Sequence, residues 1–175
     1  MTRPTRSVLA ALAMMTVACG TAPDADAAPE PGAAAAILAN LVAITLERHH
    51  YTGAEIDDAR SSQWLDGYID NLDPAQVFFL QSDVDSFRKS WATELDDTIQ
   101  SMPADLSPAF AIDKVFRTRV MERMATVDRL LAAPVLLDGD DTLIINEDDG
   151  PWPKDTSEAD TLWEKRLKAE LIRYR

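Results

Sequence analysis

The chain has 175 residues and a mass of 19.3 kDa, a length that fits one domain, and 46% of its residues are hydrophobic, enough for a packed core. It carries 17 Lys and Arg against 30 Asp and Glu. The resulting net charge of −13 argues against a nucleic-acid binder, because phosphates require a basic face, and it disfavours charge-driven docking on anionic lipid.

The N-terminus has the pattern of an export signal. Arg3 and Arg6 supply a positive start, and residues 7–18 form an uncharged, mostly apolar run that is too short to span a bilayer. This run ends at the lone cysteine, in a stretch that resembles a bacterial lipobox: Thr16, Val17, Ala18, Cys19 and Gly20. Thr16 departs from the pattern, since Leu is usual there. We predict a lipoprotein-type signal peptide at residues 1–18, with lipidation at Cys19.

Lipidation would anchor the mature chain permanently, because several acyl chains together bind a bilayer strongly. The chain would then be periplasmic and membrane-anchored, with Gly20 favouring the outer membrane if the source is Gram-negative. The alternative is an ordinary signal cut at Ala25, Asp26 and Ala27, which would release a soluble product. Residues 19–32 are rich in Ala, Asp, Pro and Glu, and their apolar residues show no helical or strand periodicity. This composition predicts an extended, disordered tether.

Helical periodicity then predicts a mostly α domain over residues 33–175, a multi-helix orthogonal or bundle-like arrangement. The first helix covers residues 33–48, and the second covers residues 56–72 and stops at Asp73–Pro74. The apolar stripe predicted to be the buried face of the first helix consists of Ile37, Leu38, Leu41, Val42, Thr45 and Leu46.

Three further helices follow. Ser82, with Asp85 three residues later, is expected to cap a third helix that continues to Ile99. Ser107 followed by Pro108 predicts the start of the fourth and longest helix. Its expected buried face consists of Phe110, Val115, Phe116, Val120, Met124, Val127, Leu130 and Leu131. The last helix starts between residues 155 and 157.

Between the last two helices, two apolar triplets have the spacing of a short β-hairpin near residues 135–146. The last helix reaches Arg175 with no Gly, Asn or Pro to end it, which predicts a polypeptide that continues.

None of the candidate chemical groups forms a catalytic pattern. His49 and His50 lack the three or four converging ligands of a metal site, so we expect a helix end. The candidate nucleophiles are Ser61, Ser62 and Ser82, and none of them lies in a Gly-x-Ser-x-Gly elbow.

The acidic segment after residue 137 resembles a calcium loop only in part. Counted from Asp138, the sixth and twelfth positions hold Leu143 and Asp149 instead of Gly and Glu, which favours a solvated acidic loop. The acidic side chains that could act as calcium ligands in this loop are Asp138, Asp140, Glu147, Asp148 and Asp149. The aromatic side chains could line a groove, but packing in a core is the commoner use: Trp64, Trp91, Trp152, Trp163, Phe78 and Phe79. No metal and no cofactor is expected.

Several stretches together resemble a known family: residues 48–51, 63–73, 78–85, 108–112, 116–120, 151–155 and 162–168. They look like the N-terminal helical region of the bacterial carboxy-terminal processing (tail-specific) protease of the long periplasmic type. The resemblance extends from Ile37 to the C-terminus. The Phe-Phe-Leu-Gln-Ser-Asp stretch beginning at Phe78 and the helix around Trp163 are its most specific parts.

The resemblance implies a parent serine endopeptidase that trims periplasmic proteins with apolar C-terminal tails. In that family a PDZ domain reads the tail and a Ser–Lys dyad cuts, both downstream of the helical region, so no catalytic residue is carried over to this chain. The expected partners are those downstream domains, protein substrates and a lipoprotein adaptor. Two alternatives are a free-standing acidic lipoprotein that acts as an interaction module or protease regulator, and a calcium-dependent adhesion module.

Overall fold

The computed structural model describes residues 32–49, 56–132, 134–135, 137 and 151–174. Six helices lie in these ranges: α1 (Ala33–His49), α2 (Asp58–Leu72), α3 (Gln81–Trp91), α4 (Leu95–Gln100), α5 (Ser107–Leu131) and α6 (Thr156–Arg173). The described residues contain no strand, so the mostly α prediction is confirmed. The hairpin predicted near residues 135–146 falls almost entirely outside the described residues.

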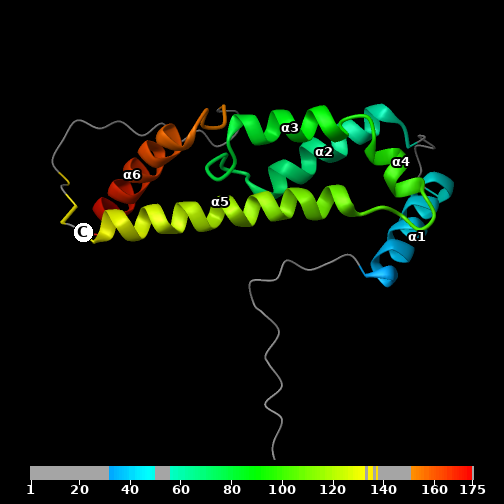
Figure 1. The fold of residues 1–175 in the computed structure, drawn as a ribbon, viewed down its shortest axis with the longest axis horizontal. Helices are drawn as coiled ribbons and strands as arrows, with labels where there is room; N and C mark the ends of the chain where they lie inside the picture. The colour runs from blue at the N-terminus through cyan, green and yellow to red at the C-terminus, as the bar shows by residue number, and fades with distance from the viewer. Residues whose placement is uncertain (1–31, 50–55, 133, 136, 138–150, 175) are drawn as a thin grey trace, which may run out of the picture.

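The helices form an elongated bundle whose long axis follows α5 (Figure 1). Helices α2 and α3 pack against each other along one side of α5, α6 packs on the C-terminal half of α5, and α1 and α4 lie at the opposite end. The core lies where α2, α3 and α5 meet. Its buried members are Leu65, Ile69, Phe79, Val84, Phe87, Ile112 and Trp152.

Local sequence signals, a proline and a capping side chain, explain two helix boundaries that the sequence predicts. Helix α2 ends at Leu72, directly before Asp73–Pro74, because the residue before a proline avoids the helical region. Helix α6 begins after Asp155, whose carboxylate accepts the backbone N–H of Glu158 at 2.9 Å and so satisfies an unpaired donor of the first turn.

Two predicted N-caps are wrong, although α5 starts at Ser107 with Pro108 in its first turn, as predicted. Ser82 lies exposed inside α3 and caps nothing; the Asp83 carboxylate instead accepts the backbone N–H of Leu80 at 3.0 Å, one turn earlier. Ser107 is the first residue of α5 and not its cap, and its backbone N–H donates to Asp105 at 2.8 Å. That hydrogen bond lowers the pKa of the exposed Asp105 carboxyl.

The single third helix predicted to reach Ile99 is also wrong. The chain leaves the helical path after Trp91 and resumes as α4, with Glu94 at φ −120°. The turn lets Ser61 of α2 bond twice to Asp96: its hydroxyl donates to the carboxylate at 2.7 Å and accepts the Asp96 backbone N–H at 2.8 Å. This buried pair holds α4 against α2.

Two predicted buried faces differ from the structure. On α5, Val115 and Phe116 pack against the core as expected, but Met124 and Leu131 are more than half exposed. The buried positions beyond Phe116 are Arg123 and Thr126, and both hydrogen-bond to Asp160 of α6. The face of α5 that is buried in its second half is therefore the polar face that meets Asp160. On α1 the apolar stripe is exposed and not buried: part of it lines an open groove against the domain, as described below.

Asp73 organises the link between α2 and α3. Its side chain is buried and accepts three successive backbone N–H groups, those of Val77, Phe78 and Phe79, at 2.8, 2.9 and 3.0 Å. The indole N–H of Trp152 also donates to it at 3.3 Å. A buried carboxylate is tolerated when it is saturated with donors, and here the donors belong to the turn that places Phe79 in the core.

We expect Asp73→Asn to destabilise the fold by about 2–4 kcal/mol, because the new NH₂ group must oppose one of these N–H donors. Urea unfolding followed by circular dichroism measures the change. Asp70→Asn, on the exposed side of α2, is the matched control and should change stability by less than about 0.5 kcal/mol. Equal effects of the two substitutions would contradict the role assigned to Asp73.

Candidate functional site

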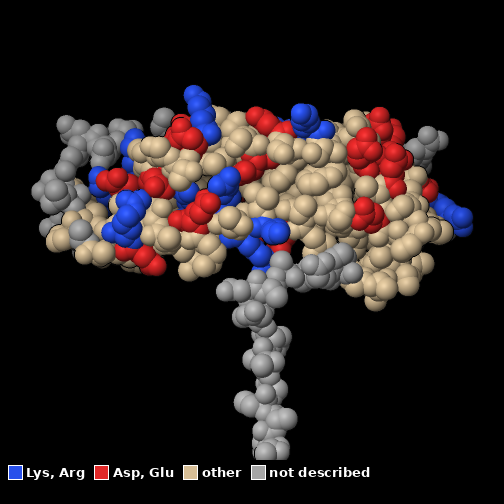
Figure 2. Space-filling view, in the orientation of Figure 1, with Lys and Arg blue, Asp and Glu red and all other residues tan. Residues whose placement is uncertain are grey.

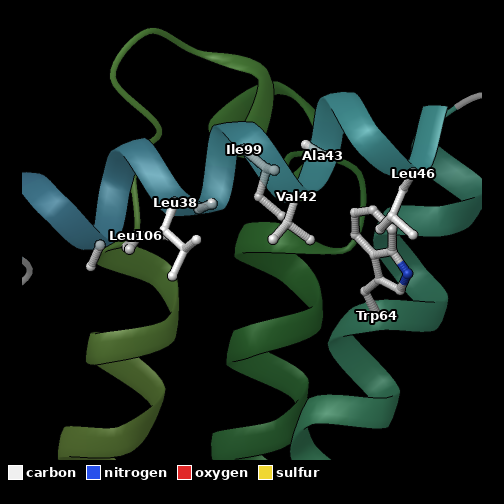
Figure 3. Close-up of a pocket in the computed structure, with 9 residues that line it drawn as sticks. Leu38, Val42, Ala43, Leu46, Trp64, Ile99 and Leu106 are labelled. Atoms are coloured by element: carbon white, nitrogen blue, oxygen red, sulfur yellow. The ribbon is translucent and has the colours of Figure 1, made fainter. Parts of the chain in front are cut away.

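An apolar groove opens between α1 and the ends of α2, α4 and α5, with a cavity volume of about 470 Å³. Leu38, Val42 and Leu46 point from α1 toward side chains of the other elements (Figure 3). The nine lining residues are Ala35, Leu38, Ala39, Val42, Ala43, Leu46, Trp64, Ile99 and Leu106. None carries a charge, so the groove can hold an apolar group but offers no acid, base or nucleophile.

A second cavity of about 260 Å³ lies on the other side of Trp64, Ile99 and Leu106 and reaches Tyr68. The Tyr68 hydroxyl donates to the carbonyl of Ala109 at 3.4 Å. Burial raises the pKa of Tyr68 above its usual 10.0, and the nearby Asp113 carboxylate raises it further. The phenol therefore stays neutral at ordinary pH, and this cavity is also lined mainly by apolar side chains.

Two side chains hydrogen-bond helix α1 to the domain: Asn40, and Glu47, whose Oε1 accepts from the Gln100 Nε2 at 3.2 Å. The Asn40 Nδ2 donates to the carbonyls of Ile99 and Ser101, both at 2.8 Å, and its Oδ1 accepts the backbone N–H of Ala104 at 3.0 Å. On either side of it, Ala36 and Ala43 are buried at 7% and 5% exposure. The closely packed face of α1 thus consists of small side chains around Asn40, and the larger Leu38, Val42 and Leu46 line the groove beside it.

The large side chains of α1 are consequently exposed, and the prediction that they form its buried face is wrong. The exposed fraction is 58% for Ile37, 61% for Leu38, 57% for Leu41 and 51% for Val42. Periodicity identified the stripe correctly, but the hydrogen bonds of Asn40 fix the rotation of the helix, so that Leu38 and Val42 line an open groove and Ile37 lies outside it.

A row of ion pairs occupies the other end of the molecule. Arg119 of α5 binds the Asp83 carboxylate of α3 through two nitrogens, at 2.8 and 2.9 Å, and these hydrogen bonds raise the pKa of the guanidinium further above its usual value. Arg123 reaches Asp160 of α6 at 2.7 Å, and Thr126 donates to the same oxygen at 3.0 Å. These pairs hold helices together and leave no free nucleophile or base among them.

The serines considered as nucleophiles are used structurally or exposed. Ser61 is fully buried and committed to Asp96 of α4, and Ser82 lies on the outer side of α3. The remaining candidate, Ser62, has no hydrogen-bonded base among the described side-chain contacts.

The residues that the sequence offers as metal ligands or as the acceptor of a lipid lie mainly outside the described residues. Only the backbone of His49 is described, at the end of α1, while His50, Cys19 and the acidic residues 138–149 lie outside. Within the described ranges no three His, Cys, Asp or Glu side chains converge as a metal site.

The aromatic residues mostly pack in the core, as expected. Phe78 contacts Phe116 and Trp163 with ring centroids 5.4 Å apart in each pair, and Phe79 contacts Phe87 at 5.6 Å. Trp163 also donates its indole N–H to the Val77 carbonyl at 2.8 Å. Trp64 is different, because it lines both apolar cavities.

Comparison with known proteins decides the family. The sequence model described as the tail specific protease N-terminal domain matches residues 42–175. The chain belongs to this family. It is 35% identical over 127 residues to the tail-specific protease of Haemophilus influenzae, an alignment that covers 73% of the chain. The family resemblance noted in the sequence is thereby confirmed, with the match beginning at Val42 and not at Ile37.

The chain spans only 18% of the length of that relative. It therefore carries the N-terminal domain of a tail-specific protease, and the match gives no support to an unrelated adhesion module or a free-standing regulator. No described helix is long and apolar enough to traverse a bilayer.

Asn40→Ala should loosen α1 while leaving the core folded, because it removes the three hydrogen bonds that fix the helix. We expect amide hydrogen exchange in α1 to accelerate as its local stability falls by about 1–3 kcal/mol, with exchange in α2 unchanged. Asn71→Ala is the control, since that side chain bonds only within its own helix, to Gly67. Unchanged protection of α1 in Asn40→Ala would show that apolar contacts hold it.

Proposed function

We propose that this domain is the non-catalytic N-terminal part of a carboxy-terminal processing serine endopeptidase that trims periplasmic proteins with apolar C-terminal tails. The observation that carries the proposal is the family match over residues 42–175.

The catalytic work of such an enzyme requires a desolvated lysine base beside a serine and a preorganised oxyanion pocket. The described helices offer instead two apolar cavities and structural ion pairs. We infer that the domain packs beside the PDZ and protease domains of its polypeptide and shapes the approach of substrates or of an adaptor.

The proposal includes an anchor. Cys19 in its lipobox-like setting would hold the chain at a membrane in the periplasm, the outer membrane if the source is Gram-negative. This part rests on the sequence alone.

The 175-residue chain by itself should not cleave a test protein that ends in an apolar tail. The tail-specific protease of H. influenzae, assayed on the same protein, is the positive control, and gel electrophoresis with mass spectrometry measures the products. Cleavage by the chain that Ser61→Ala or Ser62→Ala abolishes would overturn the non-catalytic role.

Cys19→Ser should move the exported chain from the membrane pellet to the soluble periplasmic fraction, because the acceptor of the lipid is lost. Fractionation and immunoblotting of cells that produce each form measure this. Thr16→Leu restores the usual lipobox residue and should leave the chain in the pellet. An identical distribution of wild type and Cys19→Ser would contradict lipidation.

A further inference from the structure

The smaller of the two cavities differs from the groove beside α1 in its chemistry. The described residues that line the groove are all uncharged. The cavity of about 260 Å³ between α2, α4 and α5 instead includes the polar side chains of Tyr68, Thr98 and Asp105 among apolar ones. Among the described residues that line it, Asp105 is the only charged one. This cavity therefore offers a ligand one negative group as well as apolar contact.

Asp105 holds its negative charge at a fixed place beside the cavity. Its Oδ1 accepts the backbone N–H of Ser107 at 2.8 Å, at the start of α5. Hydrogen bonds from Ser107 lower the pKa of the carboxyl, so it is ionised at ordinary pH. The side chain is exposed as well as lining the cavity, so a ligand can reach it from solvent.

Two aromatic side chains of α2 line the same cavity. Trp64 and Tyr68 are four residues apart, which places them on one side of the helix. The face of an aromatic ring carries negative potential and attracts a cation, most strongly for Trp. Tyr68 stays a neutral phenol, because burial and the Asp113 carboxylate raise its pKa. Aromatic rings beside a carboxylate are the surroundings that recognise organic ammonium groups.

The surrounding chain carries negative charge and no basic residue. Residues 90–113, which contribute α4 and the start of α5 to the cavity, contain no Lys, Arg or His. Figure 2 shows Asp and Glu side chains gathered over the end of the molecule that holds α4. The positive end of the α5 dipole also lies here, but Asp105 offsets it by accepting from Ser107. Because Asp113 is paired with Arg117 at 2.7 Å, Asp105 supplies the main charge for a ligand.

We propose that this cavity binds a small organic cation, an ammonium or quaternary ammonium group with short aliphatic substituents. Trp64, Tyr68 and Asp105 attract the charged group, and the apolar lining residues contact its substituents. Sites for drug-sized ligands have volumes of about 300–1,000 Å³, so this smaller cavity suits a ligand with few atoms. Such binding is an activity separate from the proposed protease role and does not depend on it.

Titration of the 175-residue chain followed by nuclear magnetic resonance tests the site, with choline as the probe. Its uncharged carbon isostere, dimethylbutanol, is the matched neutral compound. The reporter is the indole N–H signal of Trp64, which is assigned by its absence in Trp64→Phe. We expect choline to shift this signal saturably and to bind about tenfold more tightly than dimethylbutanol.

Asp105→Asn removes the charge but keeps an oxygen that can accept the Ser107 N–H, so the fold should be unchanged. We expect it to weaken choline binding about fivefold and to leave dimethylbutanol binding as it was. Asp97→Asn is the matched control, because Asp97 is exposed on α4 and lies outside the cavity lining. It should change the affinity for choline by less than about twofold. Circular dichroism checks that both variants are folded.

Equal affinity for choline and dimethylbutanol would overturn the proposal, because the cavity would then select for apolar shape alone. A Trp64 signal that does not saturate with choline would overturn it as well. An effect of Asp105→Asn no greater than that of Asp97→Asn would also contradict a site at Asp105. All three outcomes leave the family assignment intact, since that depends on the sequence match.

Discussion

The buried carboxylate of Asp73 is the interaction on which the bundle depends. It follows the last residue of α2, accepts the backbone N–H groups of the following turn and accepts the indole N–H of Trp152, 79 residues away. Phe79 and Val84 enter the core because this turn is fixed. Burial of an ionised group is costly unless its hydrogen bonds are complete, so loss of any one donor would be felt throughout the turn.

The two ends of the molecule are held in different ways. At the α6 end, Arg119 and Arg123 of α5 bind carboxylates on neighbouring helices. The side chain of Arg119 is partly buried and that of Arg123 is almost completely buried. At the α1 end, the hydrogen bonds of Asn40 and Glu47 and the packing of two alanines make the attachment, and larger apolar side chains line an open groove. Large apolar side chains thus stay exposed at the α1 end of the described structure.

Sequence reasoning located the helices because apolar period and stop signals are local. Asp73–Pro74 and Asp155 marked boundaries within a residue or two. It misjudged the faces of α1 and of the second half of α5, because periodicity shows where apolar side chains gather and not which side of a helix a partner covers. Asn40 and Arg123 decided those rotations through residues 59 and 37 positions away.

The candidate site was harder to foresee than the fold. The aromatic residues were correctly assigned to the core, yet the special position of Trp64 between two cavities depends on α1 and α4 meeting α2. The role of Asp73 also escaped prediction, since its donor Trp152 lies in a distant segment. A helix-stopping Asp-Pro followed by an apolar turn is the one signal that could have indicated it.

Arg123 has a consequence for how α6 can move. Its guanidinium is 1% exposed, its Nη1 is committed to Asp160, and its Nε and Nη2 have no hydrogen-bond partner in the described structure. Sliding α6 by one turn along α5 would take Asp160 away and leave Glu122, 3.5 Å from Nη2, as the carboxylate beside this buried cation. The Arg123–Asp160 pair therefore favours the observed alignment of α6 over one shifted by a turn.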